Sequence, residues 1–345
     1  MRILLCTTQI PFVSGGAEVL ARALRDALVD HGHHAEIVAV PFQWDPPDQV
    51  VRSMLVWRML DLTSYNGRAV DMVVGMKFPA YLVKHPNKVM WLLHQHKQAY
   101  QQSGRQYSNL GCTGESRRVS EMVVEADTKL IPEAKRIFAI SRTVAERLHR
   151  FNGIAAEPLY PPVANAGSLH CRSYGNYIFS PSRLDSQKRQ ELLIRAMAFV
   201  KTEVRCFLAG TGPDHERLQG LISQLGVEDR VKLLGFLTEQ ELTDWYSDAL
   251  AVYFGPLDED YGYITLEAGL SRKAVLTLSD SAGPLEFVKD QVNGFVMPPE
   301  PDAIAQKIDL MFENKRLAQA MGSRGFEMLG ELDLTWNKVV NKLLS

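Results

Sequence analysis

The feature that most constrains the fold is an alternation of short apolar runs with helix-length amphipathic segments, which continues from one end of the chain to the other. Short apolar runs bounded by turn residues are typical of buried strands. Strands that alternate with helices form parallel sheets covered by helices, because each parallel connection needs a crossover. The sequence therefore predicts an α/β protein built from Rossmann-like parallel sheets.

The apolar runs fall into two series separated by Pro161-Pro162 and a stretch of small residues, which reads as a linker. The predicted strands of the first series are 3–7, 35–40, 71–74, 89–93, 137–140 and 158–160. Those of the second series are 177–180, 204–209, 231–234, 250–254, 274–278 and 294–297. We predict two Rossmann-like domains, 1–165 and 166–330, and a final helix within 331–345.

Composition excludes several classes of protein. The chain has 345 residues, 46% of them hydrophobic and 23% charged, with a net charge of −2. This balance gives no electrostatic signature of nucleic-acid binding, and no apolar run has the length of a membrane span. The start of the chain lacks the pattern of a secretory signal. Four distant cysteines without CxxC pairing, Cys6, Cys112, Cys171 and Cys206, indicate reduced, packed thiols, so we expect a cytoplasmic protein without a zinc site.

Charge is distributed unevenly between the two predicted domains. Residues 1–165 carry 19 Lys and Arg against 15 Asp and Glu, whereas residues 166–345 carry 19 against 25. The basic excess includes Lys135, Arg136, Arg142, Arg147 and Arg150. These side chains could contact anionic lipid or a phosphorylated acceptor, which would make the N-terminal domain a peripheral membrane contact. The alternative is an ordinary solvated helix face.

The most informative motif joins an apolar strand to a helix. Glu259 and Glu267 flank a glycine turn at Gly262, followed by a predicted helix. Carboxylates accept hydrogen bonds from hydroxyls, and the backbone N–H groups of a helix N-terminus attract phosphate. The segment, including Tyr261, Tyr263, Ile264 and Thr265, could therefore bind a sugar, a ribose and a diphosphate together. The alternative is an acidic loop followed by a surface helix.

A basic pair follows the first strand of the second series. Arg183 and Lys188 bracket a turn that leads into a predicted helix at 190–200. A guanidinium and an ammonium at this place suit a diphosphate, and would offset the negative charge that grows on a leaving nucleotide. Basic residues near a helix start are unfavourable unless an anion is present, which favours a binding role.

Two further candidates lie in the first domain. Gly15 and Gly16 join the first strand to the predicted helix 17–29, within a loop that also contains Val13 and Ser14, and paired glycines let the backbone approach a ligand. A turn that needs glycine for steric reasons is the alternative. His94 ends the strand 89–93 and could donate a hydrogen bond to a reacting sugar, or could be a satisfied structural histidine.

Two more strand ends of the second domain carry candidate ligand contacts. Gly210 and the pair Phe236-Leu237 follow predicted strands and could flank a nucleobase. The triplet Asp258-Glu259-Asp260 contains a DxD spacing, but the basic pair already supplies phosphate neutralisation, so we predict no metal site and no metal cofactor.

In this order the motifs resemble the retaining glycosyltransferase family 4, the group 1 glycosyl transferases, whose members have the two-domain GT-B fold. The resemblance covers nearly the whole chain, and Glu259 and Glu267 match the E-x7-E motif of that family. It implies that Glu259 contacts the donor sugar, that Glu267 binds the ribose, and that Arg183 and Lys188 bind the diphosphate. It also implies that His94 approaches the reacting sugar and that the last helix crosses back to the first domain.

The sequence departs from the family pattern at three positions. Ser182 stands where glycine is common, Arg189 stands where glycine commonly follows the lysine, and Tyr261 replaces a phenylalanine. None of these changes removes a charged contact, so they affect the choice of donor more than the reaction.

The function implied is a retaining hexosyltransferase that uses a UDP- or GDP-linked sugar, without a metal, and a glycan or lipid-linked acceptor, in polysaccharide biosynthesis. The catalytic residues implied are Glu259, Arg183, Lys188 and His94, with the donor held by Gly15, Gly16, Gly210, Phe236, Leu237, Tyr261, Gly262, Tyr263, Ile264, Thr265 and Glu267. Two alternatives stay open: a GT-B epimerase of UDP-sugars, and a non-catalytic scaffold subunit that binds a nucleotide sugar.

Overall fold

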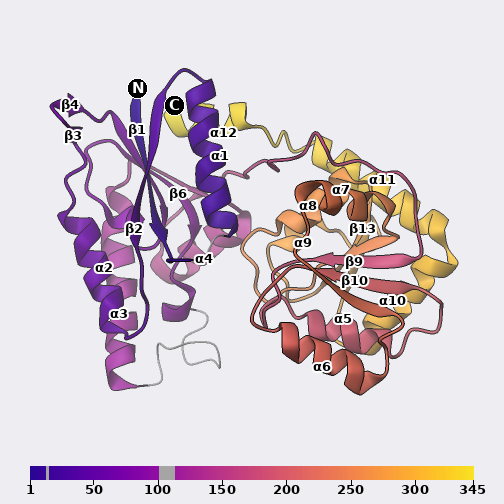
Figure 1. Ribbon diagram of the computed structural model, residues 1–345. Coiled ribbons are helices and arrows are strands. Elements are labelled where there is room, and N and C mark those ends of the chain that lie inside the picture. Colours follow the sequence, from indigo (N-terminus) through magenta and orange to yellow (C-terminus); the bar gives the residue numbers. More distant parts are fainter. Residues whose placement is uncertain (13–14, 101–112) are drawn as a thin grey trace. The chain divides into compact units, whose positions relative to one another are not determined.

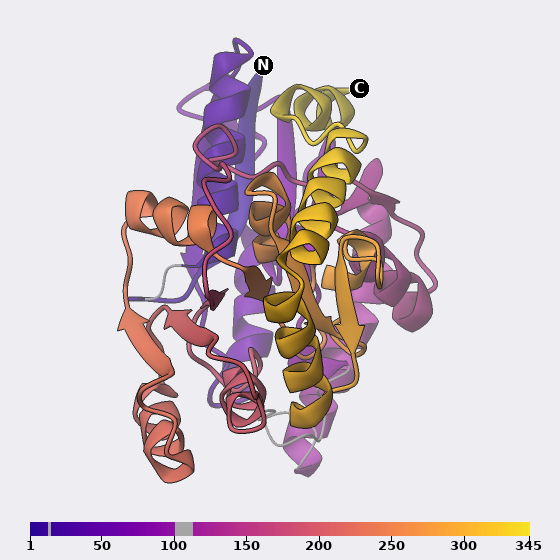
Figure 2. The same cartoon turned by 90° about the vertical axis from the view of Figure 1, so that its right-hand side faces the viewer.

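A computed structural model describes residues 1–12, 15–100 and 113–345 (Figures 1 and 2). Of the residues singled out above, Val13, Ser14 and Cys112 lie outside the described residues. The chain divides into two compact units: unit 1 is Met1–Pro162 with Thr335–Ser345, and unit 2 is Val163–Leu334. Each unit is described by itself.

Unit 1 is built on one six-stranded sheet with the order β2-β1-β5-β6-β7-β8, in which every pairing is parallel. A short antiparallel hairpin, β3–β4, lies outside that sheet. The elements are β1 (Arg2–Gln9), α1 (Gly16–Asp30), β2 (His34–Pro41), α2 (Asp48–Met59), β3 (Ser64–Tyr65), β4 (Arg68–Ala69), β5 (Met72–Lys77), η1 (Ala80–Leu82), β6 (Lys88–His94), η2 (Lys97–Ala99), α3 (Gly114–Leu130), η3 (Ile131–Glu133), β7 (Arg136–Ala139), α4 (Arg142–Asn152), β8 (Glu157–Pro158) and α12 (Trp336–Leu344).

The last helix belongs to unit 1, as the sequence predicted. Helix α12 packs beside α1, and Val339, Val340 and Leu343 on its apolar side are buried (Figure 1). Arg136 of β7 donates hydrogen bonds of 3.1 and 2.8 Å to the carbonyl oxygens of Lys342 and Leu343. A guanidinium at a helix C-terminus satisfies carbonyls that have no partner within the helix. Arg136 is therefore occupied by an internal contact, which corrects its place in the predicted lipid-facing set.

The start of this helix was predicted too early. Residues 331–344 were expected to be helical, but α11 ends at Gly330 and α12 begins at Trp336. Thr335 is the N-cap, and its side chain accepts a hydrogen bond from the N–H of Lys338. Because the backbone of Thr335 is extended, the helix cannot begin earlier than the next residue. The strand predicted at 158–160 is also displaced, since β8 is Glu157–Pro158.

Unit 2 contains a second all-parallel sheet with the order β11-β10-β9-β12-β13-β14. Figure 1 shows α5 and α6 on one face of this sheet and α7 and α8 on the other. The elements are β9 (Tyr177–Pro181), α5 (Gln190–Met197), β10 (Arg205–Ala209), α6 (His215–Leu225), β11 (Val231–Gly235), α7 (Glu239–Asp248), β12 (Ala251–Tyr253), α8 (Tyr263–Leu270), β13 (Ala274–Leu278), α9 (Pro284–Phe287), β14 (Gly294–Met297), α10 (Pro301–Glu313) and α11 (Lys315–Gly330).

The central strands of unit 2, β12 and β13, are buried along their whole length, as a parallel sheet covered by helices requires, whereas the edge strand β11 is partly exposed. Cys206, Leu208 and Leu276 are fully buried in the cluster that packs against α5, α6 and α10. The predicted fold class, two parallel-sheet Rossmann-like units, is confirmed. Among the described residues no helix has the length and apolar character needed to cross a membrane. Cys6, Cys171 and Cys206 are free thiols.

Candidate functional site

The predicted residues of unit 2 gather at one edge of its sheet. Because every strand is parallel, the carboxyl ends of β9, β10, β11 and β12 lie at the same edge, and the loops that follow them are neighbours. Arg183 and Lys188 follow β9, Gly210 follows β10, Phe236 follows β11 and Glu259 follows β12. We call these the strand-end loops of unit 2.

Two of the predicted catalytic residues contact each other. The Nζ atom of Lys188 forms a short ion pair with Oε2 of Glu259, and both side chains are mostly buried. Burial by itself would lower the pKa of Lys188, but the charge of Glu259 and the hydrogen bond to it outweigh this effect and raise the pKa. Lys188 is therefore an ammonium at neutral pH.

The backbone of Glu259 is held between two neighbouring segments. Its N–H donates to the carbonyl of Ser281 at 3.0 Å, and its own carbonyl accepts from the N–H of Gly283 at 3.0 Å. These bonds form an isolated parallel bridge between Glu259 and Ala282. Gly283 is needed there, because an added Cβ would come within 2.7 Å of the backbone nitrogen of Tyr261. The carboxylate of Glu259 thus projects from a fixed backbone.

Arg183 differs from Lys188 in its contacts. Its side chain is 55% exposed, and its nearest carboxylate is that of Asp185, with 3.8 Å between Nε and Oδ2. Such a distance is longer than a charge-assisted hydrogen bond. Within the described chain the guanidinium has no tight ion pair, so it can turn to an incoming anion at little cost.

Helix α8 begins at the glycine turn that the sequence indicated. Gly262 has φ of 88°, a left-handed conformation that glycine adopts without steric cost. The N–H of Thr265 donates to the carbonyl of Gly262 at 3.0 Å, and its hydroxyl donates to the same oxygen at 2.7 Å. The expectation that Thr265 offers its N–H to an anion is therefore corrected, and the candidates at this helix start are the amides of Tyr263 and Ile264.

Glu267 lies on α8 and is held by a tyrosine of α7. The hydroxyl of Tyr246 donates a hydrogen bond of 2.6 Å to Oε2 of Glu267. Burial raises the pKa of Glu267, and the hydrogen bond from Tyr246 opposes that rise. Tyr246 is itself fully buried, so it fixes the carboxylate from the protein side and leaves Glu267 partly exposed on the other.

Tyr246 and Arg189 are two residues near the site whose contacts the sequence did not reveal. Tyr246 is separated from Glu267 by 21 positions, and nothing in the motif marks it as a partner. Arg189 was noted only as a departure from glycine, yet it pairs with Asp280. A signal was present for Arg189 alone: an arginine where the resemblance expects glycine.

Gly210 and the pair Phe236-Leu237 are the remaining candidates among the strand-end loops. Gly210 has φ of 131°, and an added Cβ would lie 2.1 Å from the carbonyl oxygen of Ser182, so packing between two loops is enough to require this glycine. Phe236 follows β11 with its side chain 77% exposed, which leaves a ring face open for stacking. Leu237 beside it is half-buried.

In unit 1 the glycine pair opens α1 without steric need. An added Cβ at Gly16 would meet no atom within 4 Å, and one at Gly15 would meet only Oε2 of Glu18 at 3.6 Å. Neither residue has positive φ. Among the described residues the structure therefore shows no steric need for glycine at either position. Glu18 accepts from the N–H of Gly15 at 2.9 Å and from Lys77 of β5 at 3.4 Å.

His94 ends β6, as predicted. Its Nδ1 lies 2.8 Å from the carbonyl oxygen of Gln95, and because a carbonyl only accepts, Nδ1 carries the proton. The neutral ring would then accept at Nε2, so a donating role for His94 requires the charged ring. His96 is different: it is stacked on Phe78, and burial together with His94 lowers its pKa to about 3.

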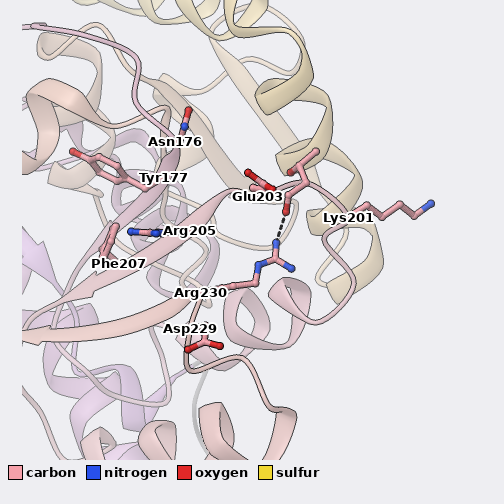
Figure 3. Close-up of a pocket in the computed structure, with 9 residues that line it drawn as sticks. Asn176, Tyr177, Lys201, Glu203, Arg205, Phe207, Asp229 and Arg230 are labelled. Atoms are coloured by element: carbon pink, nitrogen blue, oxygen red, sulfur yellow. Dashed lines mark hydrogen bonds between the residues drawn. The ribbon is translucent and has the colours of Figure 1, made fainter.

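A separate hollow lies elsewhere in unit 2. It has a volume of about 730 Å³ and is found at the amino ends of β9 and β10 and before β11 (Figure 3). Arg230 crosses it to donate hydrogen bonds of 3.0 and 2.7 Å to the carbonyls of Val200 and Thr202. None of the predicted residues lines this hollow. The strand-end loops, where acidic and basic side chains converge, are the better candidate site. Within the described residues no group of His, Cys, Asp and Glu has the arrangement of a metal site.

Comparisons with known proteins give a family match that lies within unit 2. Residues 170–328 match the family described as Glycosyl transferases group 1. An uncharacterized glycosyltransferase of Methanocaldococcus jannaschii is 35% identical over 130 residues, which are 37% of this chain and 33% of the relative. An N-acetylgalactosaminyltransferase of Campylobacter jejuni, named for a diphospho-undecaprenol substrate, is 28% identical over 145 residues, 42% of this chain and 39% of the relative. The matches therefore span well under half of either relative.

Among solved structures, HepE of Anabaena in complex with UDP and glucose has a TM-score of 0.71 at 18% identity, covering 100% of this chain and 99% of that one. At this identity the likeness concerns the fold. The fold is GT-B, as the resemblance implied.

Proposed function

We propose that this chain is a group 1 glycosyl transferase of family 4 that moves a hexosyl unit from a nucleotide-diphosphate sugar to a hydroxyl group, with retention of configuration. The observation that carries the proposal is the Lys188–Glu259 ion pair at the strand-end loops of unit 2. It unites the two kinds of group that a sugar diphosphate needs, an ammonium for phosphate and a carboxylate for hydroxyls. The family match to residues 170–328 supports it.

When the donor binds, Lys188 and Glu259 each exchange the other for a group of the donor. With no ligand, Lys188 and Glu259 neutralise each other in a mostly buried place. A diphosphate offers Lys188 a stronger negative charge, and sugar hydroxyls offer hydrogen bonds to the carboxylate of Glu259. Neither charge is left buried and unpaired in either state, which keeps the exchange from being costly. Arg183 has no tight ion pair to break, and the amides of Tyr263 and Ile264 add donors for phosphate.

Transfer then requires that the leaving diphosphate be stabilised as its bond to the sugar breaks. Lys188, Arg183 and the helix-start amides lower the energy of that developing charge, which is the differential stabilisation that accelerates a reaction. The sugar passes through an oxocarbenium-like state, and the leaving phosphate takes the proton of the acceptor hydroxyl on the same face. In this scheme Glu259 orients the sugar and does not attack it, unlike the nucleophilic carboxylate of retaining hydrolases.

A structural neighbour and a sequence relative support our choice of nucleotide base and acceptor. HepE is described in complex with UDP and glucose, so we take a UDP-linked hexose as the first donor to test, with GDP as the second. The Campylobacter jejuni relative is named for a lipid diphosphate-linked sugar, which favours a glycan or lipid-linked acceptor in polysaccharide synthesis. We also propose that the protein is cytoplasmic, that unit 1 makes a peripheral membrane contact, and that the reaction needs no metal.

The proposal is tested by thermal shift and by turnover. UDP, GDP, ADP and their hexose conjugates are added to the purified protein with and without EDTA, because a ligand that binds only the native state raises its melting temperature. We expect one nucleotide to stabilise in EDTA, and its sugar conjugate to yield a product with the donor's anomeric configuration by NMR.

Two outcomes separate the alternatives. Conversion of the donor to a second UDP-sugar in the absence of any acceptor would identify an epimerase instead. Stabilisation by a nucleotide sugar with no hydrolysis and no transfer would identify a binding scaffold. The absence of a shift with every nucleotide would contradict the assignment of the site to the strand-end loops.

A further inference from the structure

Arg189 has a backbone conformation that a residue with a side chain rarely adopts. Its φ is 52° and its ψ is 39°, in the left-handed region, immediately before α5. Glycine enters this region freely, whereas any other residue pays a steric cost. The conformation alone would favour glycine here. The side-chain contacts of Arg189 must therefore offset the steric cost of its backbone conformation.

Those contacts join three loops at the carboxyl edge of the unit 2 sheet. Two guanidinium nitrogens donate to the carboxylate of Asp280 at 2.8 and 2.6 Å, a bidentate arrangement. Nε donates to the carbonyl of Gly255 at 3.0 Å, and Nη2 also donates to the carbonyl of Pro256 at 2.8 Å. Arg189 thus connects the loop after β9 with the loops after β12 and β13. Its side chain is 11% exposed, so these bonds are shielded from water.

The loops that Arg189 joins are those that hold Glu259. Gly255 and Pro256 begin the segment after β12 that leads to Glu259, and Asp280 precedes Ser281, whose carbonyl accepts from the N–H of Glu259. The N–H of Leu257 also donates to the carbonyl of Gln187 at 2.7 Å, which ties the same segment to the residue before Lys188. Glu259 is fixed on both sides by segments that meet at one guanidinium.

We propose that Arg189 is a positioning residue that sets the place of the Glu259 carboxylate relative to Lys188, and through it the productive orientation of the donor sugar. This inference rests on the proposed function. Arg189 contacts backbone carbonyls and Asp280, and acts through the loops. Because a small displacement of an orienting group is enough to slow a reaction by orders of magnitude, its loss should reduce turnover more than affinity.

The test replaces Arg189 by glycine, which suits the backbone and removes only the side-chain bonds. In R189G we expect kcat for the donor to fall at least about tenfold, while the Kd for the free nucleoside diphosphate stays within about threefold. Hydrogen exchange of the amides at 257–259 should become faster in the ligand-free protein, because the loop loses its anchor. R189K should recover part of the lost turnover, since a single ammonium can meet Asp280 but lacks the fork that reaches both carbonyls.

Arg230 provides the matched control. It lies in the same unit and donates to backbone carbonyls in the same way, but at the amino edge of the sheet, in the hollow of Figure 3. We expect R230A to lower the melting temperature without changing kcat or the exchange of 257–259. D280N serves if R189G does not fold, with a smaller loss of turnover and faster exchange expected.

The inference is overturned if R189G keeps wild-type turnover and wild-type exchange, or if turnover falls while the amides at 257–259 remain as protected as before. The same two results in D280N overturn it when R189G does not fold. If the wild-type protein binds no nucleotide and transfers no sugar, the proposed function fails by itself. Comparing the hydrogen exchange of the amides at 257–259 in R189G and R230A still decides whether Arg189 holds the loop.

Discussion

The two sheets have the same parallel construction but different groups behind their carboxyl ends. In unit 2 the strand-end loops carry opposite charges in contact, Lys188 with Glu259 and Arg189 with Asp280. In unit 1 the corresponding region has the pair Glu18–Lys77 at 3.4 Å beside aromatic groups, with His96 stacked on Phe78. The difference teaches that a shared architecture does not distribute chemistry equally. The Lys188–Glu259 pair of unit 2 joins two residues that the sequence predicted to bind the donor.

Two carboxylates make the contrast sharper. Asp127 on α3 is fully buried and accepts hydrogen bonds from the hydroxyls of Tyr81 at 3.0 Å and Tyr100 at 2.7 Å, one on each oxygen. Glu267 accepts from Tyr246 on one oxygen and remains partly exposed. The first carboxylate is enclosed by the protein. The second is held from one side only, as a ligand contact requires.

The largest effect is expected at Glu259. Replacement by alanine removes the proposed sugar contact and leaves Lys188 without its partner, so kcat should fall by about 10²- to 10³-fold. Steady-state kinetics with the donor identified by thermal shift measures this. D248A is the matched control, because Asp248 is paired with Arg172 in the same unit but away from the strand-end loops. Equal turnover in E259A and the wild type would remove Glu259 from the mechanism.

A smaller and different loss is expected at Glu267. The E267Q variant keeps the size of the side chain but replaces a charged acceptor by a neutral one, so affinity for the nucleoside diphosphate should fall about tenfold. Turnover at saturating donor should stay within about threefold of the wild type, because the proposed contact is to the ribose in both ground and transition states. Calorimetry and kinetics on the same preparation separate the two. A loss confined to kcat would assign Glu267 another role.

At Asp127 we expect an effect on stability that depends on pH and leaves nucleotide binding unchanged. Burial raises the pKa of Asp127 to about 7, although hydrogen bonds from Tyr100 and Tyr81 lower it in part. The unfolded carboxyl titrates near pH 4, so between about pH 4 and 7 the native state holds a proton that the unfolded state has lost. Stability should therefore fall as pH rises through this window, by roughly 2–4 kcal/mol from this group.

The comparison of D127N with the wild type isolates that contribution. Chemical denaturation at several pH values should give a flatter profile for D127N across the window. D248N is the opposite control, because the bond from Arg172 lowers the pKa of Asp248, and its contribution is lost as pH falls. A wild-type profile with the same slope as D127N would show that Asp127 titrates normally.

The smallest effect is expected at His96. No described residue accepts or donates a hydrogen bond at its buried Nε2, and the lowered pKa keeps the ring neutral at physiological pH. H96F keeps an aromatic ring beside Phe78 and Phe42, so the free energy of unfolding should change by less than about 1 kcal/mol. Urea denaturation measures this change. A loss of turnover with stability unchanged would reveal a role for His96 that the stacked geometry does not suggest.

The sequence predicted most strands because their apolar runs are short and bounded by turn residues, even where a charged residue interrupts the run, as Glu36 does in β2 and Lys232 in β11. It also placed Glu259 in a loop and Glu267 within a helix, because Gly262 marks the turn between them. The start of α12 was missed because Leu332 and Leu334 continue the apolar pattern. The backbone is left-handed at Asp333, with φ of 47°, and extended at Thr335, so the helix begins only after them.

The contacts within the site could be predicted only in part. That Lys188 and Glu259 would be at one sheet edge follows from their places after parallel strands, but their direct pairing depends on side-chain reach across loops. Tyr246 and Asp280 become partners of site residues through packing of distant segments, which no local pattern encodes. The positive φ of Arg189 is likewise set by tertiary contacts that offset its cost.

The central claim is that Glu259 holds the sugar of a nucleotide-diphosphate sugar whose diphosphate is bound by its partner Lys188. It is tested most directly by calorimetric titration of UDP and of the UDP-hexose into wild type and E259Q in EDTA, with the GDP pair used instead if thermal shift selects GDP. The account predicts that E259Q weakens the sugar conjugate about tenfold while the free nucleotide binds within about threefold of wild type. Equal affinities of the two proteins for the conjugate, or an equal loss for both ligands, would contradict it.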